Sequence, residues 1–353
     1  MDFPLNLEAV KQGVTSLEFY LFGYIPIREV NVDVVPEIEA NPGGHSIGIK
    51  MQSDGVVVVG FYQVESRGFS FNPARSAGLR MGDSIVSIEG KEVADINHTA
   101  KVIEEYASQG PVSLTIKRGE EKINTNITPR YCEVEGKHLL GIYIRDTTAG
   151  VGTLSFYEPD SLLYGALGHI IIDTDTGSPV DMSKGEIVKA EIININSAQR
   201  GYPGEKTGVF LEEQGFRGTI IKNSPLGIFG HLDEDDDSPT PYPDPLPIAL
   251  ASQVEKGPAE LLTVIDGETI KSYELEIERV INQSSPADKG MVIKITDEEL
   301  LENTGGIVQG MSGSPIIQDD KLIGVVTHVF VNDPSRGYAL FMEWMVYEAE
   351  LSP

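Results

Sequence analysis

The sequence is poor in basic residues and in cysteine, and each shortage excludes a class of protein. Lysine and arginine total 27 against 54 aspartates and glutamates, which gives a formal net charge of −27. A field of that sign repels phosphate backbones and anionic lipid head groups, so nucleic acid is not expected as a partner. Cys132 is the only cysteine, which rules out a disulfide within the chain and leaves the redox compartment open.

Long apolar runs and clustered metal ligands are also missing. No run approaches the roughly 20 apolar residues that a membrane-spanning helix needs. The start, MDFP, has neither the basic residues nor the apolar stretch of a signal peptide. The six histidines show no close ligand spacing, so we expect neither a metalloenzyme nor a cofactor. With 353 residues, 40% of them hydrophobic, the chain can bury more than one core.

What the sequence does contain is a series of short apolar segments separated by turn residues, which predicts a mostly β fold. The clearest segments are SIGIKM (46–51), GVVVVGFYQV (55–64), SLTIKR (113–118), LGIYIRD (140–146) and IKNSPLGIFGHL (221–232). One helical pattern, HTAKVIEEYASQG (98–110), places its apolar residues on one face and ends at a glycine.

The segment 232–247, LDEDDDSPTPYPDPLP, gathers acids and prolines. It predicts a solvated surface loop. A metal site built from Asp233, Asp235 and Asp237 is the alternative.

The first half of the chain carries a recognisable group of motifs. They are GGHSIGIKM (43–51), PARSAGLRMGDSIVSIEGKEV (73–93) and the helical pattern already described. Residues 41–130 resemble a PDZ domain of the bacterial kind. The resemblance places Ile47, Gly48 and Ile49 at the carboxylate-binding loop. There, backbone N–H groups would hold the terminal carboxylate of a peptide that adds as a strand. We expect a peptide tail or the chain's own N-terminal segment as ligand, and a packing module that binds nothing is the alternative.

The second half contains a serine between glycines, in GMSGSPIIQDDKLIGVVTH (310–328). Glycine permits a turn that bulkier residues cannot adopt, and such a turn can direct the N–H groups of Gly310 and Ser312 at one space that holds an oxyanion. The segment resembles the nucleophile segment of trypsin-like proteases, and an ordinary turn between strands is the alternative. Ser312 is the predicted nucleophile, because Ser314 precedes a proline and is biased toward extended backbone.

A candidate general base lies earlier in the chain. GVGTLSFYEPDSLLYGALGHIIID (150–173) predicts two strands around a polar turn, with His169 at the end of the second strand. The order of histidine and then serine along the chain agrees with a trypsin-like arrangement, in which His169 would accept the proton of Ser312. For His328 we expect a hydrogen-bonded structural role, with a place in the substrate pocket as the alternative.

Longer strings resemble one family, the stage IV sporulation protein B (SpoIVB) serine peptidases of spore-forming bacteria. The strings are YGALGHIIIDTDTG (164–177), NSPLGIFG (223–230), KGPAELLTVID (256–266) and KITDEELLENTGGIVQGMSGSPIIQDDKLIGVVTHVFVNDPSRGY (294–338). The resemblance implies three parts: an N-terminal β-rich segment (1–40), the PDZ domain (41–130) and a trypsin-like double β-barrel serine protease domain (131–353). It also implies a catalytic triad, carried by His169, Asp297 and Ser312.

The resemblance further implies a role and a place. The family is secreted from the forespore into the space between the two sporulation membranes. There it cleaves itself and a membrane-bound regulator of an intramembrane metalloprotease, so that a mother-cell sigma factor matures. Family members begin with a membrane-spanning segment, whereas this chain begins MDFPLNLEAVKQG. Membrane contact is therefore expected only through partners or through a missing N-terminal anchor. The alternative function is a catalytically idle, peptide-binding scaffold, which would not need both His169 and Ser312.

The residues themselves leave the acid of the triad open. An extended chain would carry Asp173 about 13 Å from His169, at about 3.3 Å per residue. Asp175 can return toward the histidine through the turn at 174–177. The family resemblance favours Asp297, shortly before the nucleophile.

Overall fold

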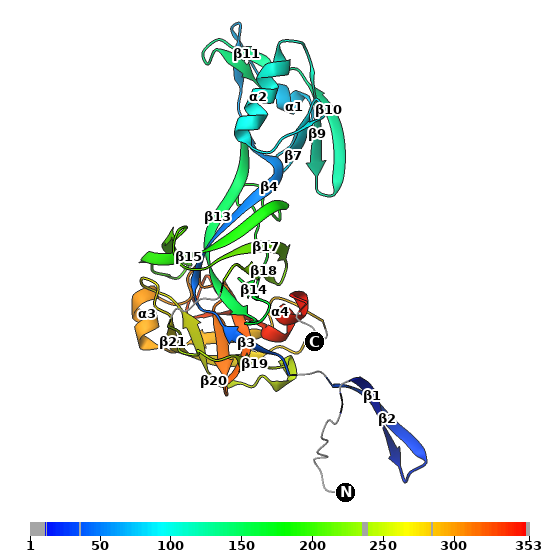
Figure 1. Ribbon diagram of the computed structural model, residues 1–353, viewed down its shortest axis with the longest axis vertical. Coiled ribbons are helices and arrows are strands. Elements are labelled where there is room, and N and C mark those ends of the chain that lie inside the picture. The colour runs from blue at the N-terminus through cyan, green and yellow to red at the C-terminus, as the bar shows by residue number, and fades with distance from the viewer. Residues whose placement is uncertain (1–10, 12, 35–36, 235–238, 284, 351–353) are drawn as a thin grey trace.

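Two β-barrels of six antiparallel strands each form the body of the protein (Figure 1). The computed structural model describes residues 11, 13–34, 37–234, 239–283 and 285–350. The strands of the first barrel are β4 (Ser46–Phe61), β13 (Ile142–Tyr157), β14 (Leu163–Ala166), β15 (Met182–Asn196), β17 (Arg217–Ser224) and β18 (Gly227–Leu232). Those of the second are β20 (Gly257–Thr263), β21 (Lys271–Val280), β22 (Met291–Ile295), β23 (Pro315–Gln318), β24 (Lys321–Val329) and β25 (Arg336–Phe341). The expected mostly β, double-barrel architecture is confirmed.

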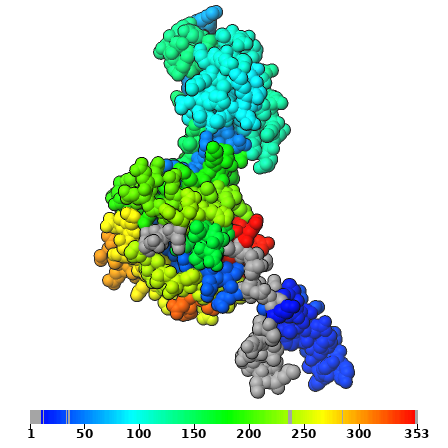
Figure 2. All heavy atoms as spheres, in the orientation of Figure 1, coloured from blue at the N-terminus to red at the C-terminus, as the bar shows by residue number. Residues whose placement is uncertain are grey.

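The expected PDZ domain stands on the first barrel as an insertion between β4 and β13 (Figure 1). Its strands and helices are β5 (Val64–Ser66), β6 (Phe69–Phe71), α1 (Pro73–Ser76), β7 (Ser84–Ile88), β8 (Lys91–Glu92), α2 (Ile96–Ala107), β9 (Val112–Arg118), β10 (Glu121–Ile127), β11 (Arg130–Cys132) and β12 (Lys137–Leu139). It has its own apolar core, to which β7, β9 and α2 contribute. The space-filling view shows that the molecule narrows between this domain and the barrels (Figure 2).

The long strands β4 and β13 each belong to both domains. In β4, residues 47–53 pair with β15 in the first barrel, whereas residues 56–57 pair with β7 in the PDZ domain. β13 returns beside β4 and pairs with it in the first barrel and in the PDZ domain. The structure therefore places residues 41–53 in the first barrel, although the sequence motifs assigned them to the PDZ domain. A continuous strand gives no local signal where it passes from one core to another.

Two burial patterns occur among the barrel strands. In β21, Tyr273, Leu275 and Ile277 are buried and alternate with more exposed residues, so one face of the strand lies in the core of the second barrel. In β24, residues 322–327 are buried without interruption. Between the barrels, α4 (Met342–Glu348) covers the junction, and its Trp344 packs against the core of the second barrel and against the apolar cluster between the two barrels.

The N-terminal β-rich segment forms a hairpin that projects from the body, β1 (Gly13–Leu21) and β2 (Ile25–Val34) (Figure 1). The remaining elements are β3 (Glu39–Pro42), β16 (Glu205–Phe210), β19 (Leu246–Pro247), the 3-10 helix η1 (Ala251–Gln253) and α3 (Glu298–Thr304). Across the described ranges, no helix combines the length and the apolar character needed to cross a bilayer.

The possible metal site of the acidic segment is only partly visible, because Asp235 and Asp237 lie outside the described residues. Elsewhere in the described chain, no three His, Cys, Asp or Glu side chains are arranged to hold a metal ion.

Candidate active site

The turn that carries Ser312 requires its glycines. Gly310 and Gly313 have φ angles of 94° and 92°, in the region that favours glycine. A Cβ atom on Gly313 would lie 2.3 Å from the carbonyl oxygen of Thr153, on the neighbouring β13. The turn is closed by the Ser314 N–H, which donates to the Met311 carbonyl at 3.0 Å. The motif Gly-x-Ser-Gly therefore holds the serine in a fixed turn against the first barrel.

The two serines of this turn have different surroundings. Ser314 is fully buried, and its hydroxyl donates to Thr263 Oγ1 at 3.1 Å. Ser312 is partly exposed and lines a pocket of about 1010 Å³. Its Oγ donates to the carbonyl of Thr327 at 3.1 Å. Of the two serines, only Ser312 can meet a substrate.

The backbone N–H groups of Gly310 and Ser312, predicted to form the oxyanion hole, are open. In the part of the chain that the structure describes, neither N–H donates a hydrogen bond. Both residues line the same pocket. Two neighbouring unbonded donors beside a serine can accept the charge of a tetrahedral oxyanion.

His169 reaches this pocket from the first barrel. It follows β14 by three residues, after Leu167 and Gly168, which both have φ angles of 70°. A Cβ atom on Gly168 would lie 2.7 Å from Val325 Cγ2, so glycine lets this loop approach β24 of the second barrel. The histidine and the serine are therefore held by different barrels and brought together where the barrels meet.

The hydrogen bonding of His169 suits a general base. Its Nδ1 lies 2.9 Å from the carbonyl oxygen of Ile170. A carbonyl only accepts, so Nδ1 carries the proton and Nε2 is left as the basic nitrogen. Burial lowers the pKa of His169 below its ordinary value, although the Ile170 bond and the charge of Asp288 oppose this. Burial therefore favours the neutral imidazole, which can accept a proton.

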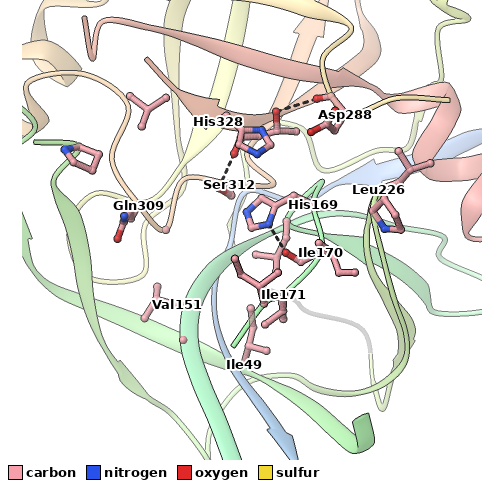
Figure 3. Close-up of a pocket in the computed structure, with 18 of the residues that line it drawn as sticks. Ile49, Val151, His169, Ile170, Ile171, Leu226, Asp288, Gln309, Ser312 and His328 are labelled. Atoms are coloured by element: carbon pink, nitrogen blue, oxygen red, sulfur yellow. Dashed lines mark hydrogen bonds between the residues drawn. The ribbon is translucent and has the colours of Figure 1, made fainter. Parts of the chain in front are cut away.

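Figure 3 shows how the polar side chains lie in the pocket. His169, Ser312 and His328 are gathered together, and Asp288 lies beside His328. The two imidazole rings are 5.7 Å apart between centroids. Apolar residues form the floor on the other side, among them Ile49, Val151, Ile171 and Leu226. The pocket thus joins the candidate nucleophile and the candidate base to a surface for apolar side chains.

Comparison with known families agrees with this geometry. The profile described as "SpoIVB peptidase S55" matches residues 136–346. This chain belongs to the SpoIVB peptidase S55 family. A PDZ domain profile matches residues 46–128 of the same peptidase. The expected family, with its combination of PDZ and peptidase domains, is confirmed.

Individual relatives match shorter parts of the peptidase. Serine protease HTRA1 of Xenopus laevis is 39% identical over 61 residues, 17% of this chain, and the match spans only 13% of that relative's length. The PDZ domain of an SdrC-like protein from Listeria monocytogenes covers 26% of this chain and 87% of its own, at 23% identity and a TM-score of 0.21. The match to the active form of Rv3671c protease from M. tuberculosis covers 58% of this chain and 74% of that chain, at 16% identity and a TM-score of 0.35.

The structure does not bring Asp297 to His169. Asp297 is the N-cap of α3, where its Oδ1 accepts the N–H of Leu300 at 2.9 Å. Its Oδ2 accepts the N–H of Glu274 at 3.3 Å, and Asp297 is not among the residues that line the pocket. In this conformation its carboxylate holds the start of a helix, which corrects the orienting role that the family resemblance implied. A sequence resemblance fixes chain position, not the direction of a side chain.

The two acids that follow His169 also face elsewhere. Asp173 is buried and pairs with Arg145 of β13 at 3.0 Å. Asp175 pairs with the same arginine. Asp173 also accepts the N–H groups of Asp175 and Thr176. These contacts hold the loop after His169 and leave neither carboxylate at the imidazole.

Asp288 is the acid that sequence reasoning missed. It lies between β21 and β22 and lines the pocket. Its charge raises the pKa of both His169 and His328, although burial, the larger effect, lowers the pKa of each. No motif surrounds it in the sequence, and only the fold places it beside the histidines. His328 proves to be exposed and to line the pocket, which was the alternative expected for it.

The predicted carboxylate-binding loop of the PDZ domain is wrong in position. Ile47, Gly48 and Ile49 are buried in β4, between β13 on one side and β15 on the other. A Cβ atom on Gly48 would lie 2.3 Å from the ring of Phe210, so this glycine allows β16 to pack on the barrel. A central strand with both edges paired has no N–H groups left for a carboxylate.

Proposed function

We propose that this protein is a serine endopeptidase with Ser312 as nucleophile and His169 as general base. One observation carries the proposal: a partly exposed serine, a histidine whose Nδ1 bonds the Ile170 carbonyl, and two unbonded N–H groups line one pocket where two barrels meet. Attack requires Ser312 Oγ to exchange its bond to the Thr327 carbonyl for one to His169 Nε2.

The residues account for each step of peptide hydrolysis. His169 takes the proton of Ser312 as Oγ attacks the substrate carbonyl. The N–H groups of Gly310 and Ser312 hold the oxyanion, and the imidazolium then gives its proton to the leaving amine. Water enters and the same base activates it to release the acyl group. Asp288 supports the imidazolium by its charge, since it raises the pKa of His169.

Labelling with a fluorophosphonate tests this assignment. The wild-type protein should be labelled at Ser312, and Ser312→Ala should lose both the label and the cleavage of a casein substrate. The turnover should fall by several orders of magnitude, as it does when a member of a triad is removed. A label that survives Ser312→Ala and disappears in Ser314→Ala would make the buried serine the nucleophile and refute the proposal.

We also propose the finer role of the family for this chain. Family membership supports an extracytoplasmic peptidase that cleaves itself and a membrane-bound regulator of an intramembrane metalloprotease during sporulation. Mass spectrometry of the wild-type protein beside Ser312→Ala tests self-cleavage, because only the former should shorten with time. Failure to restore sporulation in a spore-former that lacks its own SpoIVB would contradict the signalling role.

For the PDZ domain we propose binding of a peptide tail at the outer edge of β13. Residues 142–145 pair with β4 on one side only. Helix α2 flanks the opposite side, where the N–H of Ile96 bonds Asp146 and the N–H of His138 bonds Glu104. A strand edge beside a helix suits an added peptide strand.

Hydrogen exchange of the Ser312→Ala protein tests this site. Apolar peptides with a free carboxylate should slow exchange at residues 140–146, and the same peptides with an amidated end should bind more weakly. Protection at residues 47–49, or no protection in the PDZ domain, would contradict the assignment.

A further inference from the structure

A lysine is buried directly beneath the turn that carries the nucleophile. Lys206 lies on β16, next to the first barrel, and only 5% of it is exposed. Its Nζ donates to Thr263 Oγ1 at 2.8 Å. Within the described residues, no carboxylate lies close enough to form an ion pair with it. Burying an amine without a counter-charge is costly, so a lysine at this place calls for an explanation.

The amine stands at one end of a chain of buried hydroxyl groups. Thr263 of β20 accepts from Lys206 and also from Ser314, at 3.1 Å. Ser314 lies 3.4 Å from the hydroxyl of Thr153 on β13, and Thr153 donates to the carbonyl of Gly310 at 2.7 Å. The three hydroxyl residues are fully buried. The chain joins the first barrel, the second barrel and the nucleophile turn.

The rest of Lys206 contacts the same turn. Its backbone N–H donates to the Gln309 carbonyl at 2.9 Å. In a trans peptide the C=O and the following N–H point in opposite directions, so this bond turns the N–H of Gly310 away from β16. A Cβ atom on Gly310 would lie 3.1 Å from Lys206 Cβ, which shows how closely the aliphatic stem supports the turn.

We propose that Lys206 is a positioning residue for the oxyanion hole. Through its backbone, its stem and its amine it fixes the peptide planes on both sides of Gly310, so that the N–H of Gly310 stays directed into the pocket beside the N–H of Ser312. Such donors must lie within about 2.7–3.1 Å of the oxyanion, and small displacements are expensive for catalysis. The inference rests on the proposed role of Ser312 as nucleophile.

Two variants of the full chain test the inference, and each removes one partner of the hydrogen bond between Lys206 Nζ and Thr263 Oγ1. Lys206→Met keeps an unbranched side chain without the amine, and Thr263→Val keeps the shape without the hydroxyl. Lys184→Met, at an exposed lysine of β15, is the matched control. The measurements are kcat and KM on a peptide substrate, and the rate of fluorophosphonate labelling, in which a P–O group occupies the oxyanion site.

Lys206→Met and Thr263→Val should each lower kcat and the labelling rate by about 10-fold to 100-fold, somewhat less than the loss of a whole oxyanion donor. KM should change less than about twofold, and the double variant should lose little more than either single one, because both act on one network. A purely structural role would lower thermal stability and leave kcat per folded molecule unchanged, which would overturn the inference.

The experiment also separates this inference from the proposed function. If wild-type protein is labelled at Ser312 and folded Lys206→Met is labelled at the same rate, the positioning role is refuted while the nucleophile stands. If wild-type protein is not labelled at Ser312, the proposed function fails and the positioning role fails with it.

Discussion

Replacing the buried Lys206 with methionine should change how the stability of the peptidase domain depends on pH. Burial lowers the pKa of Lys206 to about 7, from 10.5 for an ordinary lysine. Between these two values the unfolded chain holds a proton that the folded protein has released. Folding therefore becomes more favourable as the pH rises through this interval, and below about pH 7 this lysine contributes no further dependence.

The size of the effect follows from the same two values. In the interval between them, each pH unit changes the free energy of unfolding by about 1.4 kcal/mol per proton. At pH 7 the folded lysine is still half protonated, so from pH 7 to pH 9 the wild-type protein should gain about 2 kcal/mol from Lys206. Lys206→Met has no proton to release. At pH 6–7 it should be the more stable protein, because it buries no charge, and its advantage should shrink by about 2 kcal/mol between pH 7 and pH 9.

The sole tryptophan makes the measurement selective. Trp344 packs against the core of the second barrel and against the apolar cluster between the two barrels, so its fluorescence during urea denaturation reports on the peptidase domain rather than the PDZ domain. Both proteins should carry Ser312→Ala to prevent self-digestion, and Lys184→Met on the same background is the control. The quantity to compare is the difference in unfolding free energy between Lys206→Met and its parent, at pH 6, 7, 8 and 9.

A difference between the two proteins that stays constant over this pH range would refute the reasoning. It would mean that Lys206 titrates alike in the folded and unfolded states, and hence that water or an acid reaches its amine. A difference that shrinks equally in Lys184→Met would show that the effect belongs to general surface charge.

Three further predictions concern the catalytic groups and the barrel. Because burial lowers the pKa of His169, the acid limb of the pH profile of kcat/KM should lie below 6.5, the ordinary pKa of histidine. Asp288→Asn should move this limb lower still, because the charge of Asp288 raises the pKa of His169. A limb that stays in place in Asp288→Asn would show that this carboxylate does not act on His169. Asp297→Asn should retain activity within about threefold, since asparagine also caps helices, whereas a loss near 10⁴-fold in folded protein would restore the orienting role. Gly48→Ala should lower the free energy of unfolding by about 1–3 kcal/mol, because the new methyl group crowds Phe210. In a double-mutant cycle measured by urea denaturation, adding Phe210→Leu should restore part of this loss. Strictly additive effects of the two substitutions would contradict the contact.

Local chemistry explains what could be predicted from the sequence. The turn around Ser312 depends on glycines at fixed offsets, because only they adopt its positive φ angles. His169 follows a short apolar strand that the polar turn before it marks. Short apolar segments between turn residues mark the barrel strands, so the mostly β architecture and the candidate nucleophile and base were all accessible before the fold was known.

The acid and the PDZ boundary were not accessible in this way. The family resemblance favoured Asp297, shortly before Ser312, yet its carboxylate accepts an N–H of the first turn of α3, a need that every helix start creates. Ile47 and Ile49 read as a binding loop beside glycine, yet neighbours distant in the chain pair with both edges of their strand. In each case the local pattern was compatible with two structures, and contacts with residues distant in the chain determined which one forms.

By itself the sequence determined the family, the strand-rich barrels and the short motifs that carry Ser312 and His169, because these depend on residues a few positions apart. Only the tertiary structure decided which groups surround them. It placed Asp288 beside the histidines and Lys206 beneath the oxyanion turn. The physical reason is that pKa values and hydrogen-bond partners depend on burial and on neighbours far apart along the chain, and two barrels closed against each other are what bring those neighbours together.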